Sequence, residues 1–431
     1  MTEAKPPPRK KTAGKEPRLR HLMRQLGPGI ITGAADDDPS GIATYSQIGA
    51  QFGYQLGWTV VLTTPLMAAV QEISARMGRV TGAGLGAAMS RGVPRWLTVA
   101  IVLLLIVANI FNLGADLSAM AAAAKLLFGG AENVYAVLIA IFCAACEIYF
   151  AYRRYVLILK WLTLALFAYV ALVVVVHPPL RESLAGAFIP TVGLNRDSLT
   201  ALVAVLGTTI SPYLFFWQAA EEAEDEQGEA DSRPLREHRK DAKVEFKRIR
   251  LDTYTGMIFS NSIALSIMLG TAATLHAAGK TDIQSAADAA QALAPIAGGF
   301  ASVIFSVGII GTGLLAVPVL AGSAAYAVGE AFSWRVGLHY TALEARLFYG
   351  FIALATAVGT LIVFTPLNPM KALFWSAVIN GAVAAPMIGI MVMLGSSTKI
   401  MGKLVLSWPL RVMGGLTALL MAAATLGMLV L

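Results

Sequence analysis

Long apolar segments, separated by short polar connections, recur along the whole chain. A helix needs about 20 apolar residues to cross the roughly 30 Å hydrocarbon core of a bilayer. Segments of about this length lie at 27–50, 56–77, 97–123, 134–152, 155–177, 197–220, 251–276, 300–328, 346–364, 371–394 and 408–430. The pattern therefore predicts an all-α integral membrane protein with about 11 transmembrane helices.

The composition and the placement of charge support this class. Of the 431 residues, 57% are hydrophobic and only 14% are charged, whereas a soluble chain has about 25% charged residues. If the N-terminus is cytoplasmic, 28 of the 33 Lys and Arg residues fall on the cytoplasmic side. The positive-inside rule then predicts N-terminus in and C-terminus out, in a bacterial-type cytoplasmic (inner) membrane. The net charge of +7 thus points to a lipid bilayer as the partner and not to nucleic acid.

The first apolar segment is interrupted at its centre by the sequence DDDPSG. Asp36, Asp37 and Asp38 are followed at once by Pro39, and Gly41 comes two residues later. An Asp at the centre of a transmembrane helix costs ~2.5–3.5 kcal/mol, so such residues normally face a cavity or a partner. Proline removes a backbone donor, and glycine adopts conformations closed to other residues. We therefore expect an unwound hinge whose freed carbonyl groups line a binding site.

A second interruption lies in the sixth apolar segment, within the sequence LGTTISPYL. Gly207, Thr208, Thr209 and Ser211 cluster there, next to Pro212. The first and sixth segments are five apart, so they cross the membrane in opposite directions. Paired discontinuous helices of this kind are typical of an inverted 5+5 repeat that holds its substrate between them. The alternative interpretation is that Pro212 merely kinks one helix.

The repeat predicts how the chain is organised. The expected parts are a disordered basic cytoplasmic tail at 1–24, a first repeat at 25–180, an extracytoplasmic loop at 181–196, a second repeat at 197–394 and an extra eleventh helix within 395–431. The second repeat contains a cytoplasmic loop at 221–250. We interpret the acidic half of this loop, EEAEDEQGEAD, as a solvated extension of the sixth helix.

The residue types at the two interruptions indicate which ligand they bind. Carboxylate, hydroxyl and carbonyl groups form an all-oxygen set, which suits a hard cation. Three close carboxylates do not all ionise readily, because like charges raise one another's pKa. Asp36 and Asp37 therefore have open interpretations: they attract hydrated cations from a vestibule, hold a second ion, or cap the second half of the broken helix.

Several stretches resemble the NRAMP family of divalent metal transporters. They are GPGIITGAADDDPSGIATYSQIGAQFGYQLGW and QEISARMGRVTGAGL in the first two spans, GADLSAMAAAAKLLF in the third, and the sixth span. The family's Asp-Pro-Gly-Asn motif stands here as Asp38-Pro39-Ser40-Gly41. The resemblance implies the inverted-repeat, LeuT-like fold and transport of a divalent metal ion, with no enzymatic activity and no resident cofactor.

Departures from the family motifs alter the implied metal site. Asp38 keeps the family's metal-binding aspartate, but Gly41 replaces an asparagine ligand, a loss that Ser40 could partly offset. Ser211 replaces a methionine whose sulfur contacts the metal. Because a thioether favours softer metals than a hydroxyl does, the chain resembles the NRAMP-related magnesium transporters, whose sites admit Mg²⁺ and Mn²⁺. The candidate metal ligands are Asp38, Ser211, Thr208, Ser40, Gly41, Asp37 and Asn380.

The residues at the positions that the family links to proton coupling are the second departure. Tyr213 and Gln218 occupy the positions of two histidines that the family links to proton movement, and Ala119 replaces one acid of a pair of which Asp116 remains. Without groups that titrate near physiological pH, a proton relay is hard to build. We therefore predict transport of Mg²⁺ and/or Mn²⁺ without obligatory proton coupling.

Three alternatives stay open at this point. One is a proton-coupled Mn²⁺/Fe²⁺ symporter, and another is an ion-driven symporter of an organic substrate on the same architecture, which the acidic first span disfavours. An intramembrane aspartyl protease is the third. Its G-x-G-D motif is absent: in the sequence LGAD, Leu113 stands where the first glycine of the motif would be. The sequence leaves the physiological metal and the oligomeric state open.

Overall fold

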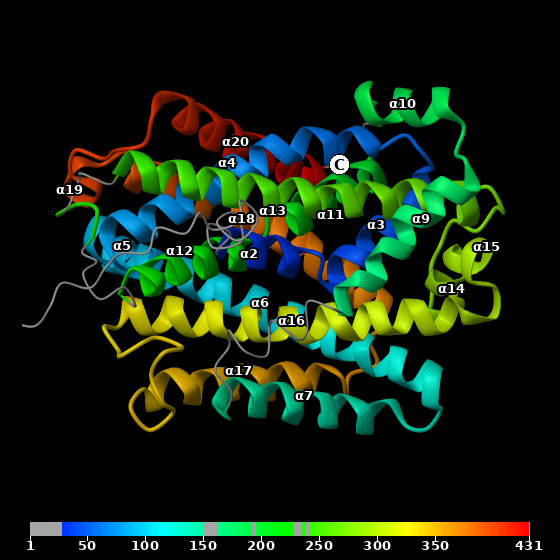
Figure 1. The fold of residues 1–431 in the computed structure, drawn as a ribbon, viewed down its shortest axis with the longest axis horizontal. Helices are drawn as coiled ribbons and strands as arrows, with labels where there is room; N and C mark the ends of the chain where they lie inside the picture. Colours follow the sequence, from blue (N-terminus) through cyan, green and yellow to red (C-terminus); the bar gives the residue numbers. More distant parts are fainter. Residues whose placement is uncertain are drawn as a thin grey trace, which may run out of the picture.

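The computed structural model describes residues 28–149, 162–191, 193, 195–227, 234–237 and 242–430. Every regular element in these ranges is helical, and the long helices run side by side in one bundle (Figure 1). The elements are α2 (Pro28–Asp36), α3 (Pro39–Phe52), α4 (Gly57–Thr81), α5 (Leu85–Gly92), α6 (Arg95–Phe128), α7 (Glu132–Tyr149), η1 (Leu162–Leu166), α9 (Phe167–Val176), α10 (Leu180–Phe188), α11 (Arg196–Thr209), α12 (Pro212–Gln227), α13 (Ala242–Thr271), η3 (Ala272–His276), α14 (Ala286–Ala290), η4 (Gln291–Leu293), α15 (Ala294–Ala297), η5 (Gly298–Phe300), α16 (Ala301–Ala331), α17 (Arg346–Ile362), α18 (Pro369–Gly395), α19 (Thr398–Met401) and α20 (Trp408–Val430).

Ten of the eleven apolar segments predicted from the sequence coincide with one long helix or with an interrupted pair of helices, and the fifth, at 155–177, is described only from residue 162, as η1 and α9. Within the described ranges, seven helices are long and apolar enough to cross a membrane by themselves. The first span falls short of this length because it is divided into α2 and α3. The tail at 1–24 and the junction of the fourth and fifth spans at 150–161 lie outside the described residues. The all-helical fold class is confirmed.

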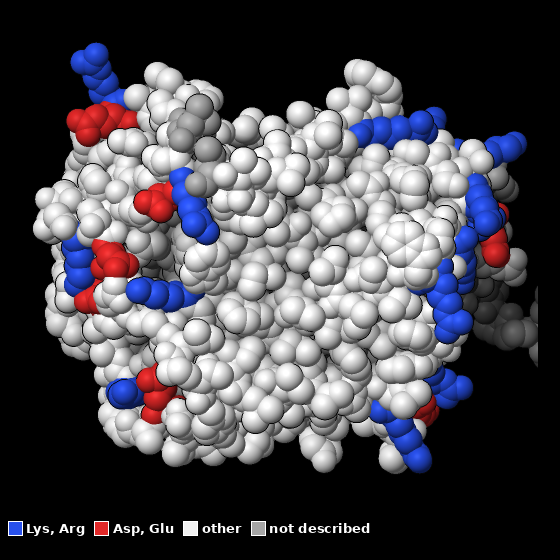
Figure 2. Space-filling model, turned by 180° about the vertical axis from the view of Figure 1, so that it is seen from behind, with Lys and Arg blue, Asp and Glu red and all other residues white. Residues whose placement is uncertain are grey.

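Charged side chains gather at the two ends of the bundle. In Figure 2, Lys, Arg, Asp and Glu occupy both ends of the visible face, and a broad band without charge separates them. Large apolar side chains such as Leu103, Val107 and Ile141 are exposed. In water such exposure would be costly, but in a bilayer it places apolar surface against lipid tails. The surface is therefore that of an integral membrane protein.

Both predicted interruptions are present. Asp37 and Asp38 separate α2 from α3, and Ile210 and Ser211 separate α11 from α12. In each case a proline opens the second half, where its missing N–H costs nothing because the first turn has no partner for it. The four half-helices pack together, α12 against α2 and α11 against α3 (Figure 1). The prediction of two discontinuous helices that face each other is confirmed.

The half-helix α2 is attached to α13 near both of its ends. At the start of α2, the Gly29 N–H donates to Oδ2 of Asp252 at 2.7 Å. Gly33, one turn later, lies so close that a Cβ there would be 2.6 Å from the Gly256 carbonyl oxygen. Small residues at both positions let the two backbones touch, as is common at helix contacts in membranes. The end of α2 is held by Ser260, as described below.

The connection predicted as a loop at 181–196 contains helix α10. Leu180, Leu184 and Phe188 recur at every fourth position and form one exposed apolar face. On the opposite face, Gly186 packs against the Tyr54 carbonyl, where a Cβ would lie 1.9 Å from the oxygen. The helical apolar spacing was visible in the sequence, but the segment is too short to span a bilayer.

Residues 221–227 of the predicted acidic extension are described, and Glu221, Glu222 and Glu226 are buried there, so the prediction of a solvated helix was wrong for these side chains. Helix α12 continues to Gln227, and Glu222 is fully buried. Its carboxylate accepts a charge-assisted hydrogen bond from Arg248 of α13 at 2.5 Å. A buried carboxylate needs such a partner to offset its desolvation, and a hydropathy pattern does not reveal which cation supplies it.

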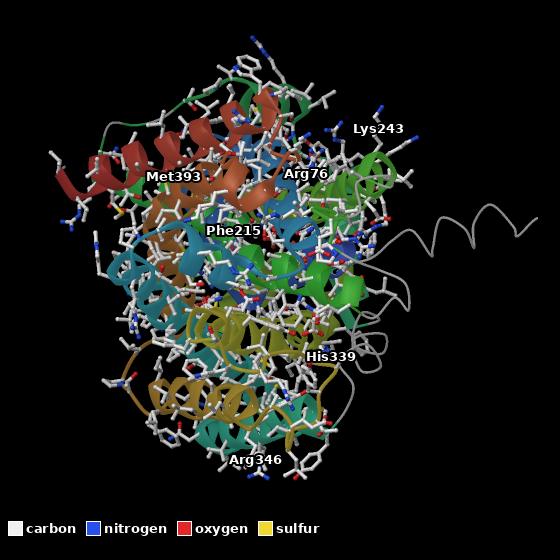
Figure 3. All side chains as sticks on the ribbon, turned by 90° about the vertical axis from the view of Figure 1, so that its left-hand side faces the viewer. Arg76, Phe215, Lys243, His339, Arg346 and Met393 are labelled. Carbon is white, nitrogen blue, oxygen red and sulfur yellow. The ribbon has the colours of Figure 1, made fainter. Side chains whose placement is uncertain are left out.

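Further ion pairs join α4 to α13 at the same end of the bundle. Figure 3 labels Arg76 of α4 and Lys243 of α13 at this end. Glu72 pairs with Arg76 on its own helix and with Arg250 of α13. The Arg76 guanidinium also lies 4.3 Å from the centre of the Phe246 ring. Together these contacts hold α4, α12 and α13 as one charged cluster next to the predicted cytoplasmic surface.

Helices α11 and α18 cross at a glycine pair beside the gap between α11 and α12. A Cβ on Gly207 would lie 1.9 Å from the Ala377 carbonyl oxygen and 2.3 Å from the Gly381 nitrogen. Both are backbone atoms, which cannot move aside without shifting a helix. The crossing therefore fixes how closely α18 approaches the interrupted sixth span.

We expect Gly207→Val to destabilise the protein, because the larger side chain forces the two backbones apart. Overpacking of this kind costs about 1–3 kcal/mol, so the melting temperature in detergent should fall clearly below that of the wild type. Gly389→Ala on α18 is the matched control, since a Cβ there meets nothing within 4 Å. Equal melting temperatures for the two variants would contradict the close crossing.

Candidate functional site

Asp38 occupies the gap between α2 and α3. It is the residue that caps the start of α3, and its Oδ1 accepts the Gly41 N–H at 2.6 Å. The side chain is buried, at 3% exposure. A carboxylate at a helix start is stabilised by the free N–H groups and by the helix dipole. These interactions hold an anionic group in the middle of the bundle.

The second oxygen of Asp38 faces two other helices. Its Oδ2 accepts from Nδ2 of Asn112 on α6 at 3.1 Å and from the Tyr213 hydroxyl on α12 at 3.2 Å. The same hydroxyl lies 3.2 Å from the Ala35 carbonyl oxygen, near the end of α2. Because a hydroxyl has one proton, Tyr213 can donate to only one of these two oxygens at a time. Oxygen atoms from the first and sixth spans thus meet around Asp38.

Thr208 reaches the same gap from the end of α11. A Cβ at Gly41 would lie 3.2 Å from Thr208 Oγ1 and 3.4 Å from Asp38 Oδ1. Glycine at position 41 therefore leaves room for the threonine hydroxyl to approach the carboxylate. The structure brings three of the predicted ligand residues together here, namely Asp38, Gly41 and Thr208.

Two other predicted ligand residues, Ser40 and Ser211, point elsewhere. The Ser40 hydroxyl bonds to α18, at 3.0 Å from the Leu373 carbonyl and 2.9 Å from the Ser376 hydroxyl. The Ser211 hydroxyl turns back to its own span and donates to the carbonyls of Gly207 and Thr208, at 2.8 and 3.0 Å. Either hydroxyl would have to rotate to contact an ion held by Asp38.

Asn380, also predicted as a ligand, is buried in α18. It adjoins Gly381, which packs directly against α11. Its Oδ1 has no hydrogen-bond partner. The structure therefore leaves this amide oxygen free, next to the helix that carries Thr208.

Asp36 and Asp37 turn away from Asp38 toward α13. The Ser260 hydroxyl lies 2.6 Å from Asp36 Oδ2 and 3.0 Å from Asp37 Oδ1. The other oxygen of Asp36, Oδ1, is buried without a partner. Asp37 is therefore not in the group of oxygens around Asp38, although it is adjacent in sequence. Sequence reasoning missed Ser260, since nothing in the pattern of α13 distinguishes it from other small polar residues.

The buried carboxylates of this region lack cationic partners. No Lys or Arg of the described ranges forms an ion pair with Asp36, Asp37, Asp38 or Asp116, and both oxygens of Asp116 are unpartnered. Burying unpaired charge in a medium of low dielectric is costly. The arrangement is therefore suited to a bound cation. In that same part of the chain, no three His, Cys, Asp or Glu side chains form a metal cluster, so a cation at Asp38 also needs neutral oxygen ligands or water.

Asn112 is a site residue that the sequence analysis missed. It lies four residues before Asp116 on α6 and is fully buried. Two polar residues at a spacing of four share one face of a helix, so their place on one side of an apolar span was a signal available in the sequence. What the spacing could not show is that this face meets Asp38.

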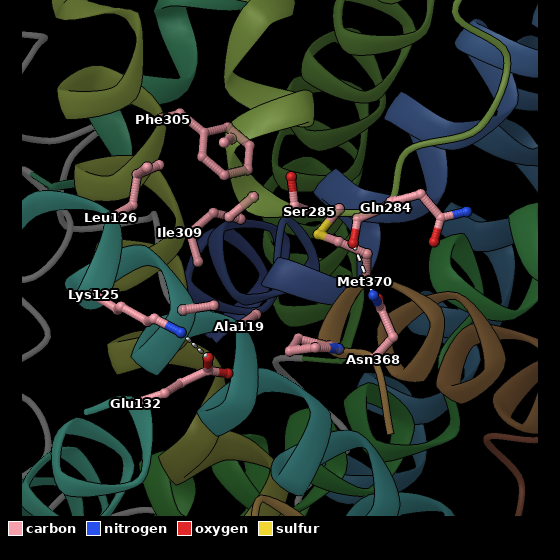
Figure 4. Close-up of a pocket in the computed structure, with 14 residues that line it drawn as sticks. Ala119, Lys125, Leu126, Glu132, Gln284, Ser285, Phe305, Ile309, Asn368 and Met370 are labelled. Carbon is pink, nitrogen blue, oxygen red and sulfur yellow. Dashed lines mark hydrogen bonds and ion pairs between the residues drawn. The ribbon is translucent and has the colours of Figure 1, made fainter. Parts of the chain in front are cut away.

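A cavity of about 450 Å³ lies at the end of the bundle where residues 277–300 connect α13 to α16 (Figure 4). Lys125 and Glu132 form an ion pair at its edge, and the Asn368 amide donates to the Gln284 carbonyl at 2.8 Å. Ala119 of α6 lines the cavity, and Asp116 and Asn112 follow on successive turns of that helix. Helix α6 thus connects the cavity wall with the Asp38 site.

Comparison with known proteins identifies the family. The family model described as Nramp, natural resistance-associated macrophage protein-like, matches residues 29–431. The chain belongs to the Nramp family. The family is one of metal-ion transporters and not of enzymes, so the expectation of a non-enzymatic transporter is confirmed and the protease alternative is set aside.

Individual Nramp relatives agree with this assignment. The divalent metal cation transporter MntH of Aeromonas hydrophila is 28% identical over 310 residues, which cover 69% of this chain and 71% of the relative. MntH of Xanthomonas campestris is 29% identical over 300 residues, or 68% of this chain and 65% of the relative.

Solved structures share the fold. A crystal structure of the Eremococcus coleocola manganese transporter aligns with a TM-score of 0.75 at 18% identity, covering 96% of this chain and 88% of that one. Mhp1, a nucleobase-cation-symport-1 family transporter, aligns with a TM-score of 0.57 at 13% identity, covering 94% and 92%. The inverted repeat inferred from the two interruptions and the LeuT-like fold implied by the family resemblance are thereby confirmed.

We expect Ser260→Ala to destabilise the protein by about 1–3 kcal/mol, because it leaves two buried carboxylates without their shared donor. The melting temperature in detergent checks this. Ser262→Ala is the matched control on the same helix, since Ser262 is exposed and its hydroxyl donates to the Ile258 carbonyl one turn earlier. A Ser260→Ala variant as stable as this control would show that the hydroxyl does not support Asp36 and Asp37.

Proposed function

We propose that the chain moves divalent metal cations, Mg²⁺ and/or Mn²⁺, across the membrane by alternating access, with the ion held between the broken first and sixth spans. The observation that carries this proposal is the Asp38 carboxylate, buried at the gap between α2 and α3, with the Tyr213 hydroxyl of the sixth span 3.2 Å from its Oδ2. Neither Lys nor Arg of the described chain neutralises it. A doubly charged cation would supply the missing charge.

Asp38 is the principal ligand in this proposal. The Ala35 carbonyl, freed by the end of α2, and the Thr208 hydroxyl are the neutral oxygens placed to join it. Ser211, Ser40 and Asn380 would join after rotation of a side chain, and Gly41 contributes the space that Thr208 occupies. Asp37 shares the Ser260 hydroxyl with Asp36 and lies outside the group of oxygens around Asp38. Water molecules would complete the shell, because Mg²⁺ gives up its hydration reluctantly.

The absence of sulfur among these groups supports a hard cation. Position 211 carries a serine hydroxyl, and hydroxyl oxygen prefers Mg²⁺ and Mn²⁺ to softer metals. The relatives are described as transporters of divalent metal cations and of manganese. We propose that this chain, like these relatives, transports divalent cations. It admits Mg²⁺ because its site lacks a thioether.

The groups on α12 support transport without obligatory proton coupling. Tyr213 bonds to Asp38, and the Gln218 amide donates to Thr253 at 2.9 Å; neither side chain titrates near neutral pH. His276, a described histidine that contacts the broken first span, bonds to the Ala50 carbonyl near the end of α3, away from Asp38. One observation favours the alternative of a proton-coupled symporter. The fully buried carboxylate of Asp116 is unpartnered and could carry a proton.

The type of membrane and the orientation follow from the distribution of Lys and Arg between the connections of the spans. We propose a bacterial-type inner membrane with the N-terminus in the cytoplasm and the C-terminus outside, because basic residues concentrate in the connections that this topology places inside. An inside-negative potential would then draw cations inward through the site. The cavity near Ala119 would open to the outside.

We expect Asp38→Ala to abolish Mg²⁺ and Mn²⁺ binding by the purified protein and uptake into proteoliposomes, because the only charged ligand is lost. Asp38→Asn keeps the helix cap but removes the charge, and it should fail in the same way while remaining folded by size-exclusion chromatography. Asp282→Ala, on an exposed connection, is the control and should bind normally. Wild-type uptake by either Asp38 variant would refute the assignment.

Uptake of Mg²⁺ or Mn²⁺ should leave the vesicle lumen at constant pH. The measurement is simultaneous recording of a metal indicator and a pH dye in proteoliposomes, with a potassium diffusion potential as the driving force. A proton ionophore is the control for a change in pH that arises from the membrane potential alone. Acidification in proportion to the metal moved would favour the proton-coupled symporter instead.

A further inference from the structure

The Asn112 amide has one atom engaged and one atom free. Its Nδ2 lies 3.1 Å from Asp38 Oδ2, and its Oδ1 is buried without a hydrogen-bond partner. The side chain is fully buried, so bulk water does not satisfy that oxygen. A buried amide oxygen that finds no donor costs free energy, and at a functional site this calls for an explanation.

The position of this amide matches a metal coordination shell. Mg²⁺ binds oxygens at 2.0–2.1 Å in an octahedron, so neighbouring ligand oxygens are about 2.9 Å apart. The Asn112 amide stands 3.1 Å from Asp38 Oδ2, and the Tyr213 hydroxyl stands 3.2 Å from it. Both separations are close to that spacing. Without a cation, the amide can meet the carboxylate only with its NH₂ group, since two oxygens would repel each other.

A cation bound to Asp38 Oδ2 reverses that preference. The metal repels the NH₂ group and attracts the amide oxygen, so a rotation of the amide by 180° brings Oδ1 to the ion. The two orientations fill almost the same volume, because the nitrogen and oxygen of an amide are nearly identical in size. Asn112 therefore needs no movement of α6 to change from donor to ligand.

We propose that Asn112 is a ligand of the transported cation, through its amide oxygen. The inference rests on the proposed function and adds a residue of the third span to the site between the first and sixth. It also supplies an amide oxygen where Gly41 has none: the asparagine ligand implied by the family motif is absent from α3, and a buried asparagine of α6 faces the same carboxylate.

Asn109 shows that burial and chemistry alone do not make such a ligand. It lies three residues earlier on α6 and is also buried, and its Oδ1 is also without a partner. Its Nδ2, however, donates to the Leu320 carbonyl and the Ser323 hydroxyl of α16, at 3.0 and 2.7 Å. No carboxylate is near it in those contacts. The neighbour of the amide, Asp38 in one case and α16 in the other, distinguishes the two asparagines.

Replacement by a thiol tests direct ligation. Asn112→Cys should raise the ratio of Cd²⁺ affinity to Mg²⁺ affinity at least tenfold over the wild type, because sulfur favours the softer ion. Both affinities are measured by isothermal titration of the purified full-length protein. Binding of Cd²⁺ should also produce a thiolate-to-metal absorption band in the ultraviolet that the wild type, which keeps Cys143 and Cys146, lacks.

Asn109→Cys is the matched control and should leave the affinity ratio within twofold of the wild type. An Asn112→Cys ratio equal to that of Asn109→Cys would overturn the proposal. The Asp38→Asn variant separates this outcome from failure of the proposed function: if Mg²⁺ binding still depends on Asp38 while the thiol has no effect, only the role of Asn112 is refuted.

Asn112→Asp provides a second test that does not depend on a thiol. A carboxylate can ligate a cation but cannot donate to Asp38. If Asn112 supplies an oxygen to the ion, Mg²⁺ affinity should hold or rise. If Asn112 serves only as a hydrogen-bond donor that positions Asp38, the variant places two anions together without a donor, and a tenfold or greater loss of Mg²⁺ affinity would overturn the proposal.

Discussion

The central constraint on this molecule is a negative charge at a break in a helix, deep inside an apolar bundle, with no basic side chain of the described residues to neutralise it. Asp38 is kept in place by the amide of Gly41, by Asn112 and by Tyr213. Each of these donors comes from a different element, so the carboxylate joins α3, α6 and α12. The packing around the gap and the chemistry of the gap are therefore set by the same atoms.

The breaks themselves could be predicted from local sequence. A proline next to aspartates, and a second proline in a cluster of hydroxyl residues, interrupt helices for reasons that involve only neighbouring backbone groups, and the odd offset between the two spans sets their relative direction. The structure has both breaks within one or two residues of those prolines. Helix α10 was not predicted from the sequence, because its nine residues are fewer than the number needed to recognise a membrane span.

Partners across the bundle could not be predicted in this way. Three consecutive aspartates look equivalent in the sequence, yet Asp38 faces α6 and α12, whereas Asp36 and Asp37 share Ser260 on α13. Likewise, the acidic end of α12 resembles a solvated helix until Arg248 is placed beside Glu222. Such assignments depend on which helix faces are in contact, and that information is distributed over residues far apart in the chain.

The attachment of α2 to α13 has a consequence for how the site could open. Asp252 holds the first turn of α2, Gly33 lies against Gly256, and Ser260 binds the last residues before the break. These three contacts leave the short helix little freedom to tilt alone. Helix α13 also packs against α3, where a Cβ on Gly49 would lie 2.4 Å from the Met268 carbonyl oxygen, so this one helix braces both halves of the broken first span.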